Sequence, residues 1–121
     1  MIEGVSWVGV ATERVAEMEN FCAAVLGLNR RVKRQDFVVF DAPNGDRLEI
    51  FGPAGPQPRY QFEMNPVVVG FQVQKIDVAR TRLAAAGIEL LGDLERGSTG
   101  SAWQHFRAPD GRVYELNQAG G

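Results

Sequence analysis

Two glutamates occupy equivalent positions in a segment that this chain contains twice. Residues 40–50, which include Glu49, recur without a gap as residues 106–116, which include Glu115. In each copy the neighbours of the glutamate are apolar, and successive side chains of a strand face opposite sides of a sheet. We therefore expect both glutamates to face away from the core. If the two copies are related by a pseudo-twofold axis, both carboxylates point into one concavity, where they could bind a ligand or exchange a proton.

The only histidine, His105, lies just upstream of Glu115 in the same predicted hairpin. If this hairpin turns through residues 108–112, His105 lies directly opposite Glu115 on one face of the sheet, and the same register in the first copy places Val39 opposite Glu49. A Glu–His pair can transfer a proton near neutral pH or replace a metal ligand. A structural histidine that is hydrogen-bonded to a carboxylate has the same pattern, and a register shifted by one residue would turn His105 to the other face. Both interpretations stay open.

Each copy of the repeated segment ends a longer unit that we predict to be β-α-β-β-β. The helices have apolar residues at spacings of three and four, and each ends at a glycine, Gly27 or Gly87. Asp77 is a natural N-cap for the second helix. The first unit is predicted to contain a strand over residues 5–11, a helix with its apolar stripe on Val15, Met18, Cys22 and Val25, and strands over 32–33, 37–41 and 47–51. The second is predicted to contain a strand over residues 67–73, a helix with its stripe on Ile76, Ala79, Leu83 and Ala86, and strands over 88–91, 102–107 and 112–117.

The two units are expected to share one hydrophobic core, because each is too short to bury a large core of its own. We predict an α+β fold in which tandem β-α-β-β-β modules, over residues 4–52 and 66–118, form a curved mixed sheet with a cup, so that residues 1–121 make a single domain. The proline-rich residues 52–66 are predicted to be a semi-extended linker that crosses the surface. Residues 95–100 are predicted to be a polar loop inserted in the second module. Pairing of the modules within one chain and exchange between two chains are both compatible with this linker.

The composition excludes several classes of partner. The net charge is −2, and no cluster of Lys and Arg is apparent on a predicted face, so a nucleic-acid partner is not expected. The apolar runs are too short to span a bilayer, and residues 1–4 do not begin a secretory signal, so no membrane partner is expected and the protein is predicted to be cytoplasmic. Cys22 is the only cysteine, which excludes an internal disulfide or a thiolate metal cluster.

The chain resembles the vicinal oxygen chelate (VOC) superfamily, which includes glyoxalases, extradiol dioxygenases, fosfomycin-modifying enzymes and bleomycin-sequestering proteins. The resemblance rests on the tandem modules, on the helix ending over residues 21–28 with Leu26-Gly27-Leu28, and on the closing hairpin over residues 108–116. It covers nearly the whole chain. Because one scaffold hosts several chemistries, the resemblance implies the fold more strongly than any one activity. It also implies a homodimer.

In metal-using members of that superfamily, four ligands come from the first, fourth, fifth and eighth strands. The resemblance places these positions on Trp7, Glu49, Val68 and Glu115. Neither Trp nor Val offers a lone pair to a divalent ion, so half of the usual site is missing. We therefore expect no metal and no other cofactor. If a divalent ion is present after all, the remaining ligand set is Glu49, His105 and Glu115.

The residues predicted to face the cup describe a pocket with aromatic walls and few polar groups. Such a pocket suits a flat, partly aromatic organic ligand that is held by stacking and oriented by a carboxylate. The predicted ligand-binding residues are Trp7, Phe37, Val39, Glu49, Val68, Gln72, Trp103, His105 and Glu115.

Two classes of function remain. In the first, the protein binds a small organic molecule without transforming it, as bleomycin-sequestering members of the superfamily do, and the missing ligands at Trp7 and Val68 favour this class. In the second, it is a lyase, an isomerase or a dioxygenase-like enzyme that uses Glu49, with Glu115 and His105 as the catalytic pair, with or without a divalent ion. The pairing of His105 with Glu115 favours the second class. The sequence leaves open whether any reaction is catalysed.

Overall fold

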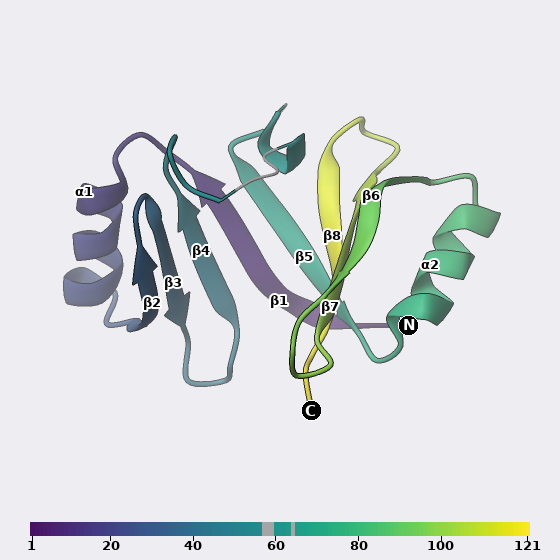
Figure 1. Cartoon of the computed structure of the whole chain (residues 1–121), viewed down its shortest axis with the longest axis horizontal. Helices are drawn as coiled ribbons and strands as arrows, with labels where there is room; N and C mark the ends of the chain where they lie inside the picture. The colour runs from purple at the N-terminus through teal and green to yellow at the C-terminus, as the bar shows by residue number, and fades with distance from the viewer. Residues whose placement is uncertain (57–59, 64) are drawn as a thin grey trace.

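The computed structural model describes residues 1–56, 60–63 and 65–121. These residues form one curved, open sheet of eight strands, with a helix at each end (Figure 1). The first half contains β1 (Ile2–Ala11), α1 (Val15–Asn20) with its π-helical continuation η1 (Phe21–Val25), β2 (Asn29–Arg34), β3 (Phe37–Asp41) and β4 (Arg47–Phe51). A 3-10 turn, η2 (Tyr60–Phe62), precedes the second half, which contains β5 (Val67–Val73), α2 (Ile76–Ala85), β6 (Glu89–Arg96), β7 (Ala102–Arg107) and β8 (Val113–Gln118). The structure thus has the predicted α+β fold of tandem β-α-β-β-β modules.

The two halves join edge to edge within one chain. The strand order is β2-β3-β4-β1-β5-β8-β7-β6, with β1 antiparallel to β5 at the centre. Each central strand also pairs in parallel with the last strand of its own half, so that Gly9 lies beside Glu49 and Gly70 lies beside Glu115. This arrangement places the two glutamates at equivalent points on either side of the centre, as the repeat predicts.

The helices cover the outer face of the sheet and leave the inner face to the cup. Under α1 the sheet buries Val38, Phe40 and Ile50 against Cys22, and under α2 it buries Phe106 and Leu116 against Ile76 and Ala79. Complete burial of one such large apolar side chain stabilises the fold by about 1.5–3 kcal/mol. A third cluster, formed by Trp7, Phe51 and Val68 with Phe37 and Phe62 packed against it, belongs to the cup.

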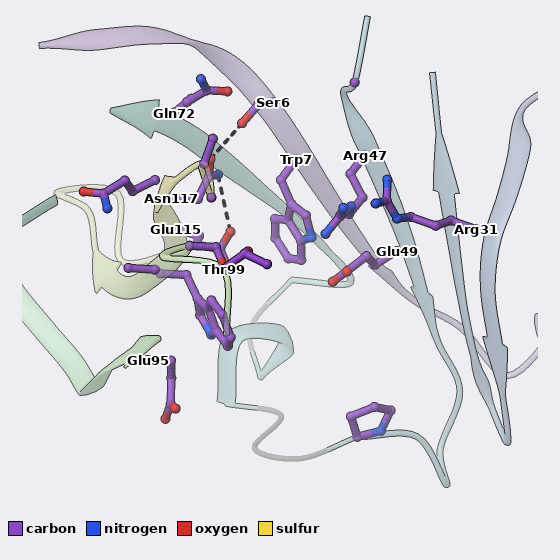
Figure 2. A pocket seen from close by; sticks show the side chains of 18 of the residues that line it. Ser6, Trp7, Arg31, Arg47, Glu49, Gln72, Glu95, Thr99, Glu115 and Asn117 are labelled. Carbon is purple, nitrogen blue, oxygen red and sulfur yellow. Dashed lines mark hydrogen bonds between the residues drawn. The ribbon is translucent and has the colours of Figure 1, made fainter. Parts of the chain in front are cut away.

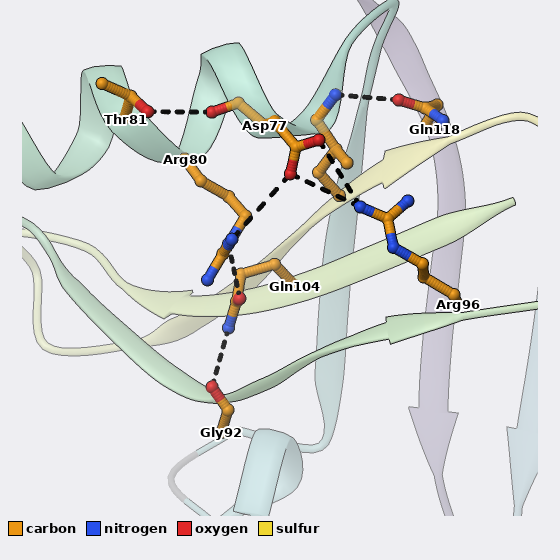
Figure 3. A network of polar contacts seen from close by, with 8 residues as sticks. Asp77, Arg80, Thr81, Gly92, Arg96, Gln104 and Gln118 are labelled. Atoms are coloured by element: carbon orange, nitrogen blue, oxygen red, sulfur yellow. Dashed lines mark hydrogen bonds and ion pairs between the residues drawn. The ribbon is translucent and has the colours of Figure 1, made fainter.

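Polar contacts fix α2 to the second half of the sheet (Figure 3). The helix begins at Ile76, whose backbone N–H donates to the side chain of Gln118 at 2.9 Å. The Arg80 guanidinium donates to the fully buried Gln104 amide oxygen at 2.9 Å, and the Gln104 amide nitrogen donates in turn to the Leu91 carbonyl at 2.8 Å. Because a buried amide without partners is costly, these bonds hold β6 and β7 in place beside His105.

Most predicted elements are confirmed, and the differences lie at their ends. The prediction that Asp77 is an N-cap is wrong, since α2 already begins at Ile76. The backbone N–H of Ile76 donates to Gln118 from β8. Val25 is exposed and does not continue the buried stripe of the first helix. The strand β6 extends through Arg96, so the predicted loop over residues 95–100 begins as strand.

The predicted surface linker over residues 52–66 does not stay on the surface at its 3-10 turn; residues 57–59 and 64 lie outside the described residues. Tyr60–Phe62 forms a turn that packs into the cup rather than crossing the surface. Its Phe62 ring lies 5.1 Å from the Phe51 ring, and Gln61 is buried. Across the described part of the chain, no helix has the length and apolar character needed to cross a membrane.

Candidate functional site

The inner face of the sheet encloses a cavity of about 890 Å³ (Figure 2). Its size lies within the range of small-molecule sites in proteins. Aromatic side chains from both halves and from the turn η2 line it, namely Trp7, Phe37, Phe51, Tyr60 and Trp103. Glu49, Gln72 and Glu115 also line it, so six of the nine predicted ligand-binding residues meet at one cavity.

The other three predicted residues do not line this cavity. Val39 and Val68 face the same side of the sheet but are buried, at 4% and 0% exposed. Val68 is packed in one cluster with Trp7 and Phe51. His105 is also buried, because the turn η2 lies over it.

The Trp7 indole lies across Gly9 and forms part of the cavity wall. An added Cβ at Gly9 would approach the indole ring to 2.3 Å and the Phe62 ring to 3.2 Å. Glycine is therefore required at this position of β1 for the indole to reach its place. In this position the indole lowers the pKa of the Glu49 carboxyl, as a nearby N–H donor does.

The Glu49 carboxyl is partly buried beside the cavity, and its pKa is raised from the ordinary value. Burial is the main cause, because removal from water disfavours the charged form. The negative charge of Glu115 raises the pKa further, whereas the Trp7 indole N–H and the Arg47 guanidinium lower it. Glu49 is thus a carboxyl group that a ligand in the cavity can reach and whose proton is held more tightly than usual.

The Glu115 carboxylate is tied into a buried polar chain. The predicted register is confirmed, and His105 lies directly opposite Glu115 with its Nε2 3.4 Å from Oε1. This contact is too poorly aligned to count as a hydrogen bond, so Nε2 has no hydrogen-bond partner among the described residues. The Tyr60 hydroxyl lies 3.0 Å from the other ring nitrogen, Nδ1. On its far side Glu115 accepts from Asn117 at 3.5 Å, and Asn117 accepts from Ser6 at 2.9 Å.

Three arginines stand on one wall of the cavity, and two of them, Arg31 and Arg34, were not predicted from the sequence to face the cup. Arg31 and Arg34 of β2 and Arg47 of β4 all line it. A bulge in β2 between Arg30 and Val32 disturbs the alternation of its side chains. The face of the sheet to which each charged side chain points was therefore not predicted. The run of basic residues at 30–34 was the signal that pointed to a charged surface.

The cup does not fit the four-ligand metal site of the resembled superfamily. At two of the four positions stand Trp7, whose indole N–H is a donor directed at Glu49, and Val68, which is fully buried. The remaining set predicted for a divalent ion, Glu49, His105 and Glu115, is not assembled. Within the described residues, no three His, Cys, Asp or Glu side chains are close enough together to hold a metal ion. The physical reason is that His105 directs one nitrogen at Glu115 and the other at Tyr60.

Solved structures with the same fold include methylmalonyl-CoA epimerases. That of Mycobacterium tuberculosis has a TM-score of 0.73 at 15% identity, over 99% of this chain and 90% of that chain. A Streptomyces coelicolor methylmalonyl-CoA epimerase variant in complex with 2-nitronate-propionyl-CoA has a TM-score of 0.68 at 16% identity, over 100% of both chains. A glyoxalase/bleomycin resistance protein/dioxygenase superfamily member from Vibrio splendidus 12B01 has a TM-score of 0.62 at 21% identity, over 93% of this chain and 96% of that chain. At these identities the likeness shows the fold alone.

No curated protein sequence matches the chain. The family described as Glyoxalase/Bleomycin resistance protein/Dioxygenase superfamily matches residues 4–116, which is most of the chain and includes both halves of the sheet. The chain therefore belongs to the glyoxalase/bleomycin resistance protein/dioxygenase superfamily.

Proposed function

We propose that this protein binds a small, flat organic molecule in the cup and does not transform it. The observation that carries the proposal is the cavity of about 890 Å³, which has aromatic walls and the carboxyl group of Glu49 in its lining. A flat ligand would stack on Trp103 and Trp7 and donate a hydrogen bond to Glu49. Aromatic contacts of this kind supply most of the binding energy, and a single polar contact fixes the orientation.

The surroundings of the polar residues favour binding over catalysis. Glu115 and His105 are both less than a tenth exposed, and their polar atoms face each other, Tyr60 and Asn117. A proton on His105 has no direct route to a ligand, because His105 does not line the cavity. The pair therefore supports the shape of the cup, and of the two repeated glutamates Glu49 is the one that meets the ligand.

Tryptophan fluorescence tests the proposal, because both tryptophans line the cup. We expect naphthalene derivatives to quench it in a saturable manner, and compounds with the same carbon skeleton but saturated rings to bind more weakly. Trp103→Ala is expected to weaken binding by about 1 to 3 kcal/mol through the loss of stacking area. A matched control is Tyr114→Leu, which removes an aromatic ring stacked on Phe71 and Phe106 on the outer face and should leave binding unchanged. Failure of every aromatic compound to quench would contradict the proposal.

A second candidate function is proton transfer at a carbon acid, and the raised pKa of Glu49 favours it. A carboxylate with a raised pKa is a stronger base than an ordinary one. Glu49 would remove the proton from a carbon next to a carbonyl group and return it to the resulting enolate. The fold is shared with methylmalonyl-CoA epimerases, so methylmalonyl-CoA is the substrate to try first.

Proton exchange separates the two functions. In D2O, an enzyme of this kind would replace the acidic C–H of methylmalonyl-CoA by C–D, which NMR detects, and Glu49→Gln would abolish the exchange. Under the binding proposal the protein adds nothing to the slow uncatalysed exchange. Exchange that requires Glu49 would replace the binding proposal by the enzymatic one.

A further inference from the structure

The strand β2 divides its four positive charges between the two faces of the sheet. Arg30 and Lys33 face α1, where both contact the single carboxylate of Glu19, at 2.5 Å and 3.1 Å. After the bulge, Arg34 lies opposite Phe37, whose side chain lines the cavity, and Arg31 lines the cavity as well. The two outward charges thus share one carboxylate within the fold, whereas the other two are directed to the cup.

The cup side has more positive than negative charge along this wall. Arg31 contacts Asp41 at 2.6 Å, and the Arg47 Nε lies 3.5 Å from the other oxygen of the same carboxylate. The Arg34 guanidinium has no hydrogen bond or ion pair within the described part of the chain. The Asp41 carboxylate therefore contacts two of the three guanidinium groups on this wall and not the third. We call Arg31, Arg34 and Arg47 the arginine wall.

The opposite side of the cavity is acidic. Figure 2 shows Arg31, Arg47 and Glu49 on one side and Glu95 and Glu115 on the other. All five side chains line the same cavity. The cavity is therefore polarised, with positive charge from the first half of the chain and negative charge mainly from the second. A ligand with a charged group can enter in only one favourable orientation.

We propose that the arginine wall is a subsite for the anionic group of the ligand, so that the ligand is a flat organic acid bearing a carboxylate or a phosphate. This inference rests on the proposed function, since it names the chemical class that the cup would bind. A guanidinium group is planar and presents paired N–H donors that match carboxylate and phosphate oxygens. Arg34 is free to make such a pair without breaking another contact, and Arg47 needs only to loosen a 3.5 Å contact.

Position along the cup favours the same assignment. Arg47 and Glu49 are two residues apart on β4 and face the same side, and the positive charge of Arg47 already acts on the Glu49 carboxyl. A ligand whose acid group meets the arginine wall would therefore place the next part of its ring system at Glu49 and the tryptophans. The low-dielectric walls of a cleft strengthen such charge interactions relative to an open surface.

The test uses four naphthalene probes of nearly equal shape and different charge: 2-naphthoate, 2-naphthyl phosphate, 2-naphthylmethanol and 2-naphthylmethylammonium. Binding of each is measured by titration calorimetry on the wild type, Arg34→Gln and Arg47→Gln. The matched control is Lys33→Gln, which removes a positive charge from the neighbouring position of β2 that faces α1. The two anions differ in geometry and charge, so their order of affinity shows which acid group the wall prefers.

The anionic probes are expected to bind more tightly than the neutral one, and the cationic probe most weakly. Each arginine variant is expected to weaken binding of the preferred anion by about five- to tenfold, as for a charge-assisted hydrogen bond at a partly exposed site. Lys33→Gln should change affinity by less than about twofold, because its charge is on the other face and is screened. The arginine variants should not affect the neutral probe.

Two results would overturn the inference in different ways. If the neutral probe binds as tightly as the anions, or if Arg34→Gln and Arg47→Gln behave like Lys33→Gln, the arginine wall is not a subsite, although the cup still binds aromatic molecules. If none of the four probes binds to any variant or to the wild type, the proposed function fails and the inference fails with it.

Discussion

The two glutamates of the repeat have equivalent backbone positions but different surroundings. Each lies beside a glycine of the neighbouring parallel strand, Glu49 beside Gly9 and Glu115 beside Gly70. At Gly9 the space is filled by the Trp7 indole, which leaves Glu49 at the cavity. At Gly70 it is filled by Asn117 and by Glu115 itself. The same local sequence thus produces one carboxyl group that is available to a ligand and one that is held in a buried polar chain.

This difference shows that a sequence repeat conserves strand register more readily than it conserves function. Register follows from the hairpin and from the apolar alternation, which are the same in both halves. The role of each glutamate follows from side chains that are not repeated, such as Trp7 in the first half and His105 in the second. Substitutions around Glu49 or around Glu115 test this comparison.

The largest effect is expected from Gly9→Ala. Its Cβ would meet the Trp7 ring at 2.3 Å, and the indole cannot move easily because Phe51, Val68 and Phe62 pack around it. We expect a loss of about 2–3 kcal/mol in the free energy of unfolding, as for overpacking in a core. Urea denaturation measures it. The control Gly4→Ala lies in the same strand with nothing within 4 Å and should be nearly neutral; equal stability of the two variants would show that the indole does not cover Gly9.

Removal of each carboxylate should have unequal effects on stability. Glu115→Ala leaves the buried groups of His105 and Asn117 facing a void, and we expect it to lower the free energy of unfolding by about 2 kcal/mol. Glu49→Ala should lower the free energy of unfolding by about 0.5 kcal/mol or less, because the Glu49 carboxyl borders the open cavity and has few contacts to lose. Thermal and urea unfolding of the two variants give the comparison. Equal losses would mean that both glutamates are structural.

The pH dependence of stability should separate Glu49 from the rest of the cup. Burial raises its folded-state pKa above the ordinary value of 4.5, so the unfolded chain releases this proton first as the pH rises. The stability that Glu49 contributes is complete below pH 4.5 and is lost as the pH rises through the folded-state pKa. Relative to wild type, Glu49→Gln should therefore gain stability as the pH rises through this window, by about 1.4 kcal/mol for each unit of pKa difference. If the difference in the free energy of unfolding between Glu49→Gln and the wild type does not depend on pH, the pKa of Glu49 is not raised.

A smaller effect is expected at the turn η2. Tyr60→Phe removes the hydroxyl that lies 3.0 Å from the Nδ1 of His105, and it should lower the free energy of unfolding by about 1 kcal/mol. The control Tyr114→Phe removes a hydroxyl that donates to Asp110 at an exposed site and should cost less than about 0.5 kcal/mol. If both variants lose the same amount, the turn does not depend on its bond to His105.

The smallest effect is expected from chelation. Because Trp7 and Val68 stand at two of the four ligand positions, we predict that the purified protein contains no stoichiometric divalent ion and that EDTA leaves its melting temperature unchanged. Elemental analysis checks the first point and differential scanning fluorimetry the second. About one equivalent of a divalent metal per chain would contradict the prediction, because no three His, Cys, Asp or Glu side chains among the described residues come together to hold it.

The sequence was most informative where local chemistry decides structure. The Pro-Asn-Gly and Pro-Asp-Gly turns with apolar alternation predicted β3, β4 and β7 to the residue, and the register that pairs His105 with Glu115. It was least informative where a distant part of the chain decides. The start of α2 depends on Gln118 from β8, and the path of the linker depends on the aromatic surface that Phe62 meets in the cup.

The repeated pattern by itself determined the two-module fold and the side of the sheet that each glutamate faces, because these follow from alternation along single strands. Only the tertiary structure decided how the glutamates differ and that three arginines share one wall. A bulge changes which side chains share a face, and burial and charge depend on neighbours far apart in sequence. These properties belong to the assembled cup, and no single strand contains them.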